Sequence, residues 1–230
     1  MKKVKKNNLA TDILHRLIFT NRCRLCMKVI PLADALCDDC KIEKLRVPEN
    51  FFSTKTYSQK IFDNLTSPFY YESHIKKGIH NLKYGGYSKC GEFLAMEMAE
   101  VIERDFADEG PDFITCVPMS KKRKREKDFN QCEILIKHIG KVYGYKPIPN
   151  LLIKSKHTPT QVNLKYKERL TNLKGAFEVN KKYDVKNKTV LICDDVITTG
   201  STLNECSRTL KKAGAKRVIC VTAAITHNDT

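Results

Sequence analysis

The stretch TVLICDDVITTGSTL, residues Thr189 to Leu203, decides the fold of this chain. Its first half is apolar and rich in β-branched residues, which is typical of a buried strand, and it ends in two adjacent carboxylates, Asp194 and Asp195. A turn rich in hydroxyl groups follows. Apolar residues at helical spacing then predict an amphipathic helix with one face formed by Leu203, Cys206, Leu210 and Ala213. The order of strand, turn and helix is the geometry that holds a phosphate group.

The turn carries the chemistry that a sugar phosphate needs. Gly200 lets the backbone approach a ligand closely or adopt a positive φ. Backbone N–H groups and the positive end of the helix dipole attract an anion. Asp194 and Asp195 suit ribose hydroxyls or a bound Mg²⁺. A plain strand followed by a capped helix accounts for one hydroxyl group as the N-cap. It does not account for two carboxylates and four hydroxyl residues, which are Thr198, Thr199, Ser201 and Thr202.

Composition and charge restrict the classes of protein. The chain has 230 residues, of which 41% are hydrophobic, so it can bury a core. Apolar runs of the ~20 residues that a membrane span requires do not occur. The basic start, residues 1–19, lacks the apolar core of a signal peptide, so we expect a cytoplasmic protein. The net charge of +16 favours a polyanionic partner such as nucleic acid over the alternative, a charge that serves solubility alone.

Four of the ten cysteines are regularly spaced. Two C-x-x-C pairs, ten residues apart, predict two knuckles that together bind one tetrahedral Zn²⁺ through Cys23, Cys26, Cys37 and Cys40. Pro31 between them fits a turn. A pair of redox dithiols is the alternative, but two such units in close succession favour structural zinc. The other six cysteines, at 90, 116, 132, 193, 206 and 220, are interpreted as small core residues.

The chain divides into two parts by composition. We expect a basic leader and zinc ribbon over residues 1–50 and an α/β domain over residues 51–230, joined by the polar stretch VPENFFSTKTYSQ. Beyond this stretch, predicted strands alternate with predicted helices, which indicates a parallel sheet covered on both faces. The strands are expected in residues 69–71, 112–118, 148–153, 189–193 and 217–225, and the helices at Ile75, Ile79 and Leu82, at Leu94, Met98, Val101 and Ile102, and at Cys132, Leu135, Ile136 and Ile139.

A second candidate phosphate loop follows the predicted strand at residues 112–118. Its cations, foremost Lys121, Lys122 and Arg123, are interpreted as ligands of pyrophosphate or of a nucleic-acid backbone, and Phe129 as a base-stacking residue. A solvated basic loop is the alternative. Three further residues, Lys83, Gln161 and Arg169, are weaker candidates for the same site, and helix capping or surface pairing explains them equally well.

The segment DDVITTGST resembles the phosphoribosyl-pyrophosphate (PRPP) motif of type I phosphoribosyltransferases. The order of the zinc ribbon, YYESHIKKGIHNLKYGG, VPMSKKRKREKDFNQCE, TPTQVNLKYKERLTNLKGAF and CDDVITTGSTL resembles the ComF family over nearly the whole chain after residue 22. That resemblance implies a zinc ribbon joined to a phosphoribosyltransferase-like domain. It also implies a role in natural competence, in handling imported single-stranded DNA.

The chain departs from the family pattern in two places. Lys127 and Asp128 stand where the family has Arg-Gly before Phe-Asn-Gln, and Lys154 and Lys156 stand where it favours arginines. Lysine keeps the positive charge but lacks the planar fork of arginine. Phosphate attraction is therefore retained, while the loop geometry of the family is not assured.

Two main hypotheses follow. In the first, which we favour, the zinc ribbon and basic loops bind single-stranded DNA while the ribose-phosphate pocket, with Mg²⁺ and PRPP, regulates or organises the domain. In the second, the chain is an active phosphoribosyltransferase with an unknown acceptor, in which Asp194 and Asp195 are catalytic and pyrophosphate leaves. An adaptor whose zinc ribbon docks a competence helicase is a third hypothesis.

Overall fold

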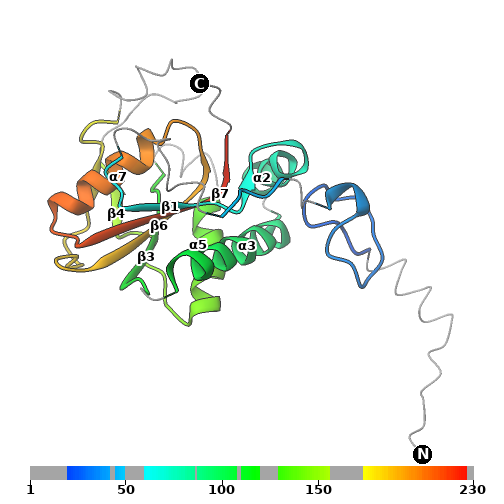
Figure 1. The fold of residues 1–230 in the computed structure, drawn as a ribbon, viewed down its shortest axis with the longest axis horizontal. Coiled ribbons are helices and arrows are strands. Elements are labelled where there is room, and N and C mark those ends of the chain that lie inside the picture. Colours follow the sequence, from blue (N-terminus) through cyan, green and yellow to red (C-terminus); the bar gives the residue numbers. More distant parts are fainter. Residues whose placement is uncertain are drawn as a thin grey trace, which may run out of the picture.

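The computed structural model describes residues 20–41, 45–49, 60–85, 87–107, 110–119, 129–155 and 173–226. Its centre is a parallel sheet in the order β1-β7-β6-β3, and β2 continues the edge beside β7 (Figure 1). The strands are β1 (Asn64–Thr66), β2 (Phe69–Tyr70), β3 (Phe113–Cys116), β6 (Thr189–Ile197) and β7 (Arg217–Ile225). The two long strands β6 and β7 pair side by side, so the most apolar segments of the chain form the middle of the sheet.

The central strands have apolar side chains on both faces. Leu191 pairs with Ile219 and packs on one face, whereas Ile192 pairs with Cys220 and packs on the other. Since successive side chains point to opposite faces, a continuous apolar run is what a sheet covered on both sides requires. The alternation divides the core into two clusters, one on each side of β6 and β7.

Helices cover both faces of the sheet. The helices α3 (Ser88–Phe106) and α5 (Gln131–Tyr143) pack together on one face, and α7 (Ser201–Lys212) covers the opposite face (Figure 1). The strands β4 (Leu152–Lys154) and β5 (Phe177–Val179) pair antiparallel beside α7 and complete that layer. Both faces of the central strands are therefore shielded from water.

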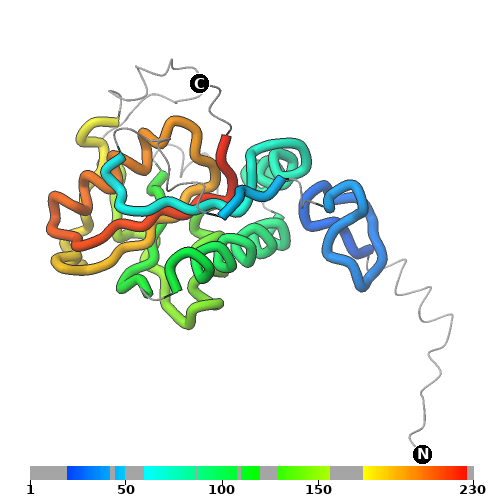
Figure 2. The backbone as a smooth tube through the Cα atoms, in the orientation of Figure 1, coloured from blue at the N-terminus to red at the C-terminus, as the bar shows by residue number. Residues whose placement is uncertain are grey.

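The N-terminal ribbon packs against α2 (Ser73–Gly85), as the chain trace shows (Figure 2). Leu25 of the ribbon is fully buried, and its carbonyl accepts a 2.8 Å hydrogen bond from Nδ2 of Asn81. The contact is close because Gly78 has no side chain: a Cβ there would lie 2.4 Å from Cδ2 of Leu25. The ribbon thus shares a core with α2 and α3.

The structure confirms the predicted α/β class with its parallel sheet, and it corrects several details. The strand β6 runs through both aspartates to Ile197 instead of ending before them. Ala213 is exposed and lies just beyond α7, because the helix ends at Lys212. The strand expected in residues 148–153 is β4, which lies outside the parallel sheet, and the sequence analysis did not predict β1 or β5. None of the helices that the structure describes combines the length and apolarity needed to cross a bilayer.

Candidate functional site

Two helices begin at the same edge of the sheet. Cys116 at the end of β3 pairs with Cys193 of β6, so the parallel strands bring the following segments to one edge. There α5 begins at Gln131 and α7 begins at Ser201. Asn130 caps α5, since its Oδ1 accepts a 3.0 Å hydrogen bond from the N–H of Cys132. Two helix N-termini, each with a positive dipole end, therefore border the segment that carries the aspartates.

The hydroxyl-rich turn before α7 has a defined geometry. Gly200 has a φ of 73°, in the left-handed region that favours glycine, and its carbonyl accepts a 2.8 Å hydrogen bond from the N–H of Asn204. Oγ1 of Thr199 lies 2.7 Å from Oγ of Ser201, which is buried at the first position of the helix. Thr198 is exposed, whereas Thr199 and Thr202 are half-buried. The turn thus gathers hydroxyl groups around the start of α7.

Asp195 is held by two donors from different helices. Nζ of Lys83, in the last turn of α2, lies 3.0 Å from Oδ2 of Asp195. Nε2 of Gln131 donates to the same oxygen at 2.7 Å. The side chains of Lys83 and Asp195 are 24% and 9% exposed, so the pair is largely screened from water. Burial alone would lower the pKa of Lys83, but the adjacent Asp195 carboxylate outweighs it and the pKa is raised.

Asp194 has a different environment. Its Oδ1 accepts a hydrogen bond from the N–H of Asp195 at 2.9 Å and lies 3.5 Å from Sγ of Cys132. Burial raises the pKa of Asp194 to about 7, and the neighbouring charge of Asp195 contributes in the same direction. Adjacent carboxylates thus differ: Asp195 is paired with a cation, while Asp194 changes its charge near neutral pH.

Gln131 and Cys132 belong to this site, although the sequence analysis did not single them out as site residues. Both begin α5, and Oε1 of Gln131 is buried and has no hydrogen-bond partner among the residues that the structure describes. Cys132 is buried, as predicted, but its thiol faces Asp194 as well as the core. The signal that would have found them is their position at the start of a predicted helix, in the segment Phe-Asn-Gln-Cys that closes the basic loop.

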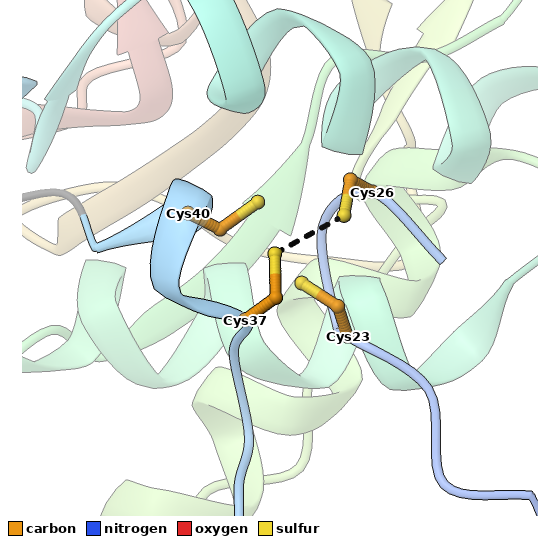
Figure 3. Close-up of side chains that lie close together, drawn as sticks. All are labelled: Cys23, Cys26, Cys37 and Cys40. Atoms are coloured by element: carbon orange, nitrogen blue, oxygen red, sulfur yellow. Dashed lines mark hydrogen bonds between the residues drawn. The ribbon is translucent and has the colours of Figure 1, made fainter. Parts of the chain in front are cut away.

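The four ribbon cysteines converge on one point. Their sulfur atoms all lie within 4.8 Å of one another, and Sγ of Cys26 is 3.5 Å from Sγ of Cys37 (Figure 3). In a tetrahedral site with Zn–S bonds of about 2.3 Å, the sulfur atoms stand about 3.8 Å apart. Cys23 accepts and donates backbone hydrogen bonds that close the first knuckle, and the N–H of Asp34 donates to the carbonyl of Pro31 in the turn between the knuckles. The arrangement fits a tetrahedral metal ion such as zinc.

Several predicted residues lie outside the described part of the chain. These are Lys121, Lys122, Arg123, Lys127, Asp128, Lys156, Gln161 and Arg169. Phe129 is described and is half-buried next to the cap of α5, and Lys154 lies on β4 with its ammonium group 5.7 Å from the ring centre of Phe177.

Comparison with known proteins shows which family and which relatives the chain is similar to. A family model described as "Phosphoribosyl transferase domain" matches residues 92–230. Competence protein F of Haemophilus influenzae is 37% identical over 109 residues, which cover 47% of this chain and 48% of that protein. The DNA utilization protein YhgH of Salmonella typhimurium is 27% identical over 199 residues, 85% of this chain and 86% of that protein. Competence protein ComFC of Bacillus subtilis is 22% identical over 180 residues, 78% and 68% of the two chains.

Solved structures share less with the chain. Glutamine PRPP amidotransferase from B. subtilis has a TM-score of 0.38 and 18% identity over 57% of this chain and 26% of that chain.

The matched region of Competence protein F is about half of that protein. The relatives named Competence protein F, ComFC and YhgH confirm the resemblance to the ComF family. The match over residues 92–230 covers more than half of the sequence, and the chain therefore belongs to the phosphoribosyl transferase domain family.

Proposed function

We propose that this chain is a ComF-like competence protein that binds PRPP or a related ribose phosphate beside α7 and handles single-stranded DNA. The observation that carries the proposal is the placement of Asp194 and Asp195 next to the turn at Gly200, where hydroxyl groups gather at the start of α7. The names of the relatives, which refer to competence and to DNA utilization, support the role in DNA handling.

The ribose phosphate would occupy the edge of the sheet. Its 5-phosphate would bind at the N-terminus of α7, to backbone N–H groups and to the hydroxyls of Thr198, Thr199, Ser201 and Thr202. Its ribose hydroxyls would contact Asp194 and Asp195. The partnerless Oε1 of Gln131 supports this placement, because a ribose hydroxyl can donate to it. Mg²⁺ would enter with PRPP and neutralise the charge of its pyrophosphate, and Lys121, Lys122 and Arg123 remain proposed ligands of pyrophosphate or DNA.

The zinc ribbon is proposed as a structural element. Cys23, Cys26, Cys37 and Cys40 would hold one Zn²⁺ and stabilise a segment too small to fold on its own core. The proposed division of the chain is a basic leader and ribbon over residues 1–50 and the α/β domain over residues 51–230, and residues of the ribbon share a hydrophobic core with α2. We propose that the protein acts in the cytoplasm on imported single-stranded DNA. A competence helicase is a proposed partner.

An active transferase is the second candidate. It is favoured by the way Lys83 and Gln131 hold Asp195, since a preorganised carboxylate can stabilise the positive charge that develops at the anomeric carbon. In that reaction the bond from this carbon to pyrophosphate breaks, a bond to the acceptor forms, and pyrophosphate leaves. Asp194 and Asp195 would be the catalytic carboxylates.

One titration tests both candidates. Calorimetry of the zinc-loaded protein with PRPP and Mg²⁺ is expected to show saturable binding, and the variant with both Asp194→Asn and Asp195→Asn is expected to bind at least ten-fold more weakly. Unchanged binding in that variant would refute the site. Release of pyrophosphate, followed with and without single-stranded DNA, separates the transferase from the binding protein.

A further inference from the structure

A groove lies between the ribbon and α2, away from the aspartates. Its volume is about 470 Å³, and it is lined by Cys26, Ser73, Lys76, Lys77, His80 and Asn81. Cys26 comes from the ribbon and the other residues come from α2. The lining residues from α2 are polar and offer hydrogen-bond donors, and two of them, Lys76 and Lys77, are cations.

The exposed face of α2 carries cations and no carboxylate. The helix contains Lys76, Lys77 and Lys83 and no aspartate or glutamate. The two sides of the helix carry different lysines: Lys83 pairs with Asp195 at the sheet, while Lys76 and Lys77 are exposed in the groove. Two acidic residues lie at this end of the helix: Glu72 directly precedes it, and Asp39 forms an ion pair with Lys28 of its own ribbon and is also close enough to Lys77 for that cation to lower its pKa. Cations therefore predominate along the groove.

Aromatic surface adjoins the cations. The rings of His80 and Tyr84, one helical turn apart, have centroids 4.5 Å from each other, and Tyr84 is 68% exposed. Proteins that bind single-stranded nucleic acid stack its bases on exposed rings and bind its phosphates with neighbouring cations. The rings and lysines of α2 offer both kinds of contact. An acidic protein segment would use the lysines but would have no need of the rings.

We infer that this groove binds single-stranded nucleic acid, with backbone phosphates at Lys76 and Lys77 and a base on the His80–Tyr84 ring pair. The inference rests on the proposed DNA-handling function and assigns it a surface separate from the ribose-phosphate site. Cys26 of the ribbon lines the groove beside the residues of α2, and Leu25, one residue before it, packs in the core that the ribbon shares with α2.

Binding of a fluorescent single-stranded oligothymidylate to the full chain, measured by anisotropy over a range of salt, tests the inference. The Lys76→Ala, Lys77→Ala double variant is expected to lose about ten-fold in affinity. Its plot of log K against log salt is expected to become less steep by about 1.4, the value for two lost phosphate contacts on a single strand. Tyr84→Ala is expected to lose about ten-fold without a change of slope, because stacking involves no counterion. The matched control is the Lys181→Ala, Lys182→Ala variant, which removes the same charge from an exposed turn before β6.

The outcomes separate the two proposals. If the wild-type chain does not bind the oligonucleotide, DNA handling and the groove both fail, whereas PRPP binding is judged by its own titration. If the wild-type chain binds and the two double variants weaken equally, DNA handling survives and the groove is overturned. Competition by polyglutamate as strong as by unlabelled oligonucleotide would also overturn it, and would assign the groove to an acidic protein segment. PRPP binding is expected to be unchanged in all the groove variants.

Discussion

Lys83 of α2 and Asp195 of β6 form an ion pair with a 3.0 Å distance between Nζ and Oδ2, and this pair joins the helix that carries the ribbon to the strand that carries the carboxylates. Because α2 contacts the ribbon on one side and Asp195 on another, the two candidate sites share a single rigid element. Changes that displace α2 are therefore expected to affect both.

The ion pair is expected to stabilise the fold. Lys83→Met leaves the largely buried Asp195 carboxylate with Gln131 as its one side-chain partner among the described residues, so the free energy of unfolding should fall by about 2 kcal/mol, less than for a fully buried pair. Chemical denaturation measures this change. Lys137→Met is the control, since it removes an exposed lysine from α5. Equal denaturation midpoints for the two variants would contradict the stabilising role of the pair.

The raised pKa of Asp194 predicts a pH dependence of stability. In the folded protein the carboxyl has a pKa of about 7 and in the unfolded chain about 4, so between these values the folded state binds more protons. Stability must then fall as the pH rises. From pH 5 to pH 7 the ligand-free protein should lose about 2 kcal/mol relative to Asp194→Asn.

Denaturation of both proteins at pH 5, 6 and 7 supplies the measurement. Titrating groups far from Asp194 contribute equally to the two proteins, so the difference reports Asp194 together with the neighbours that interact with its charge. Parallel profiles would show that the folded and unfolded states bind the proton at this position equally.

Gly200 is expected to matter for the ligand beyond its effect on stability. Gly200→Ala places a side chain at φ 73°, which should cost about 1 kcal/mol and shift the hydroxyls of Thr199 and Ser201. Gly144→Ala is a matched control, because Gly144 has a φ of 68° at the end of α5 and open space around it. Both variants should lose similar stability, and only Gly200→Ala should lose PRPP affinity in calorimetry. Equal PRPP affinity in the two variants would show that the conformation of the turn at Gly200 does not affect ligand binding.

The ribbon is expected to contain about one zinc ion per chain. Replacing Cys23 and Cys26 by serine should abolish this content in elemental analysis, and it should make the ribbon sensitive to protease because metal binding supplies its folding free energy. Cys206→Ala, which alters a buried cysteine of α7, should keep the zinc. Wild-type protein that is intact and free of zinc would refute the metal site.

The close contact between Gly78 and Leu25 predicts a packing effect. Gly78→Val inserts a branched side chain where a Cβ alone would lie 2.4 Å from Cδ2 of Leu25, so it should push the ribbon off α2 and cost about 2 kcal/mol. Gly85→Val, at the end of the same helix, has no atom within 4 Å of the new Cβ and serves as the control. Denaturation and the rate of protease cleavage within the ribbon report the effect. Equal cleavage rates would show that the ribbon does not depend on this contact.

The sequence alone determined the elements whose signals are local. The apolar runs of β6 and β7, the helical spacing in α2, α3, α5 and α7, the turn at Gly200 and the paired cysteines are all patterns within a few residues of one another. Such patterns follow from backbone geometry and from burial of one face of an element, so they can be recognised without partners. The strands β1 and β5 contain polar residues within their three positions and show no apolar run, unlike the similarly short β2 and β4, which lie in runs of apolar residues.

Only the tertiary structure decided which distant residues meet. The pairing of Lys83 with Asp195, the approach of Gln131 and Cys132 to the carboxylates, and the groove between the ribbon and α2 depend on how α2 and α5 pack on the sheet. The local sequence around Lys83 is equally compatible with a solvent-exposed cation at a helix end. The helix α2 packs closely on Leu25 at Gly78, shares the sheet core through its buried residues and carries Lys83 to Asp195, and all three contacts join residues that are far apart in the sequence.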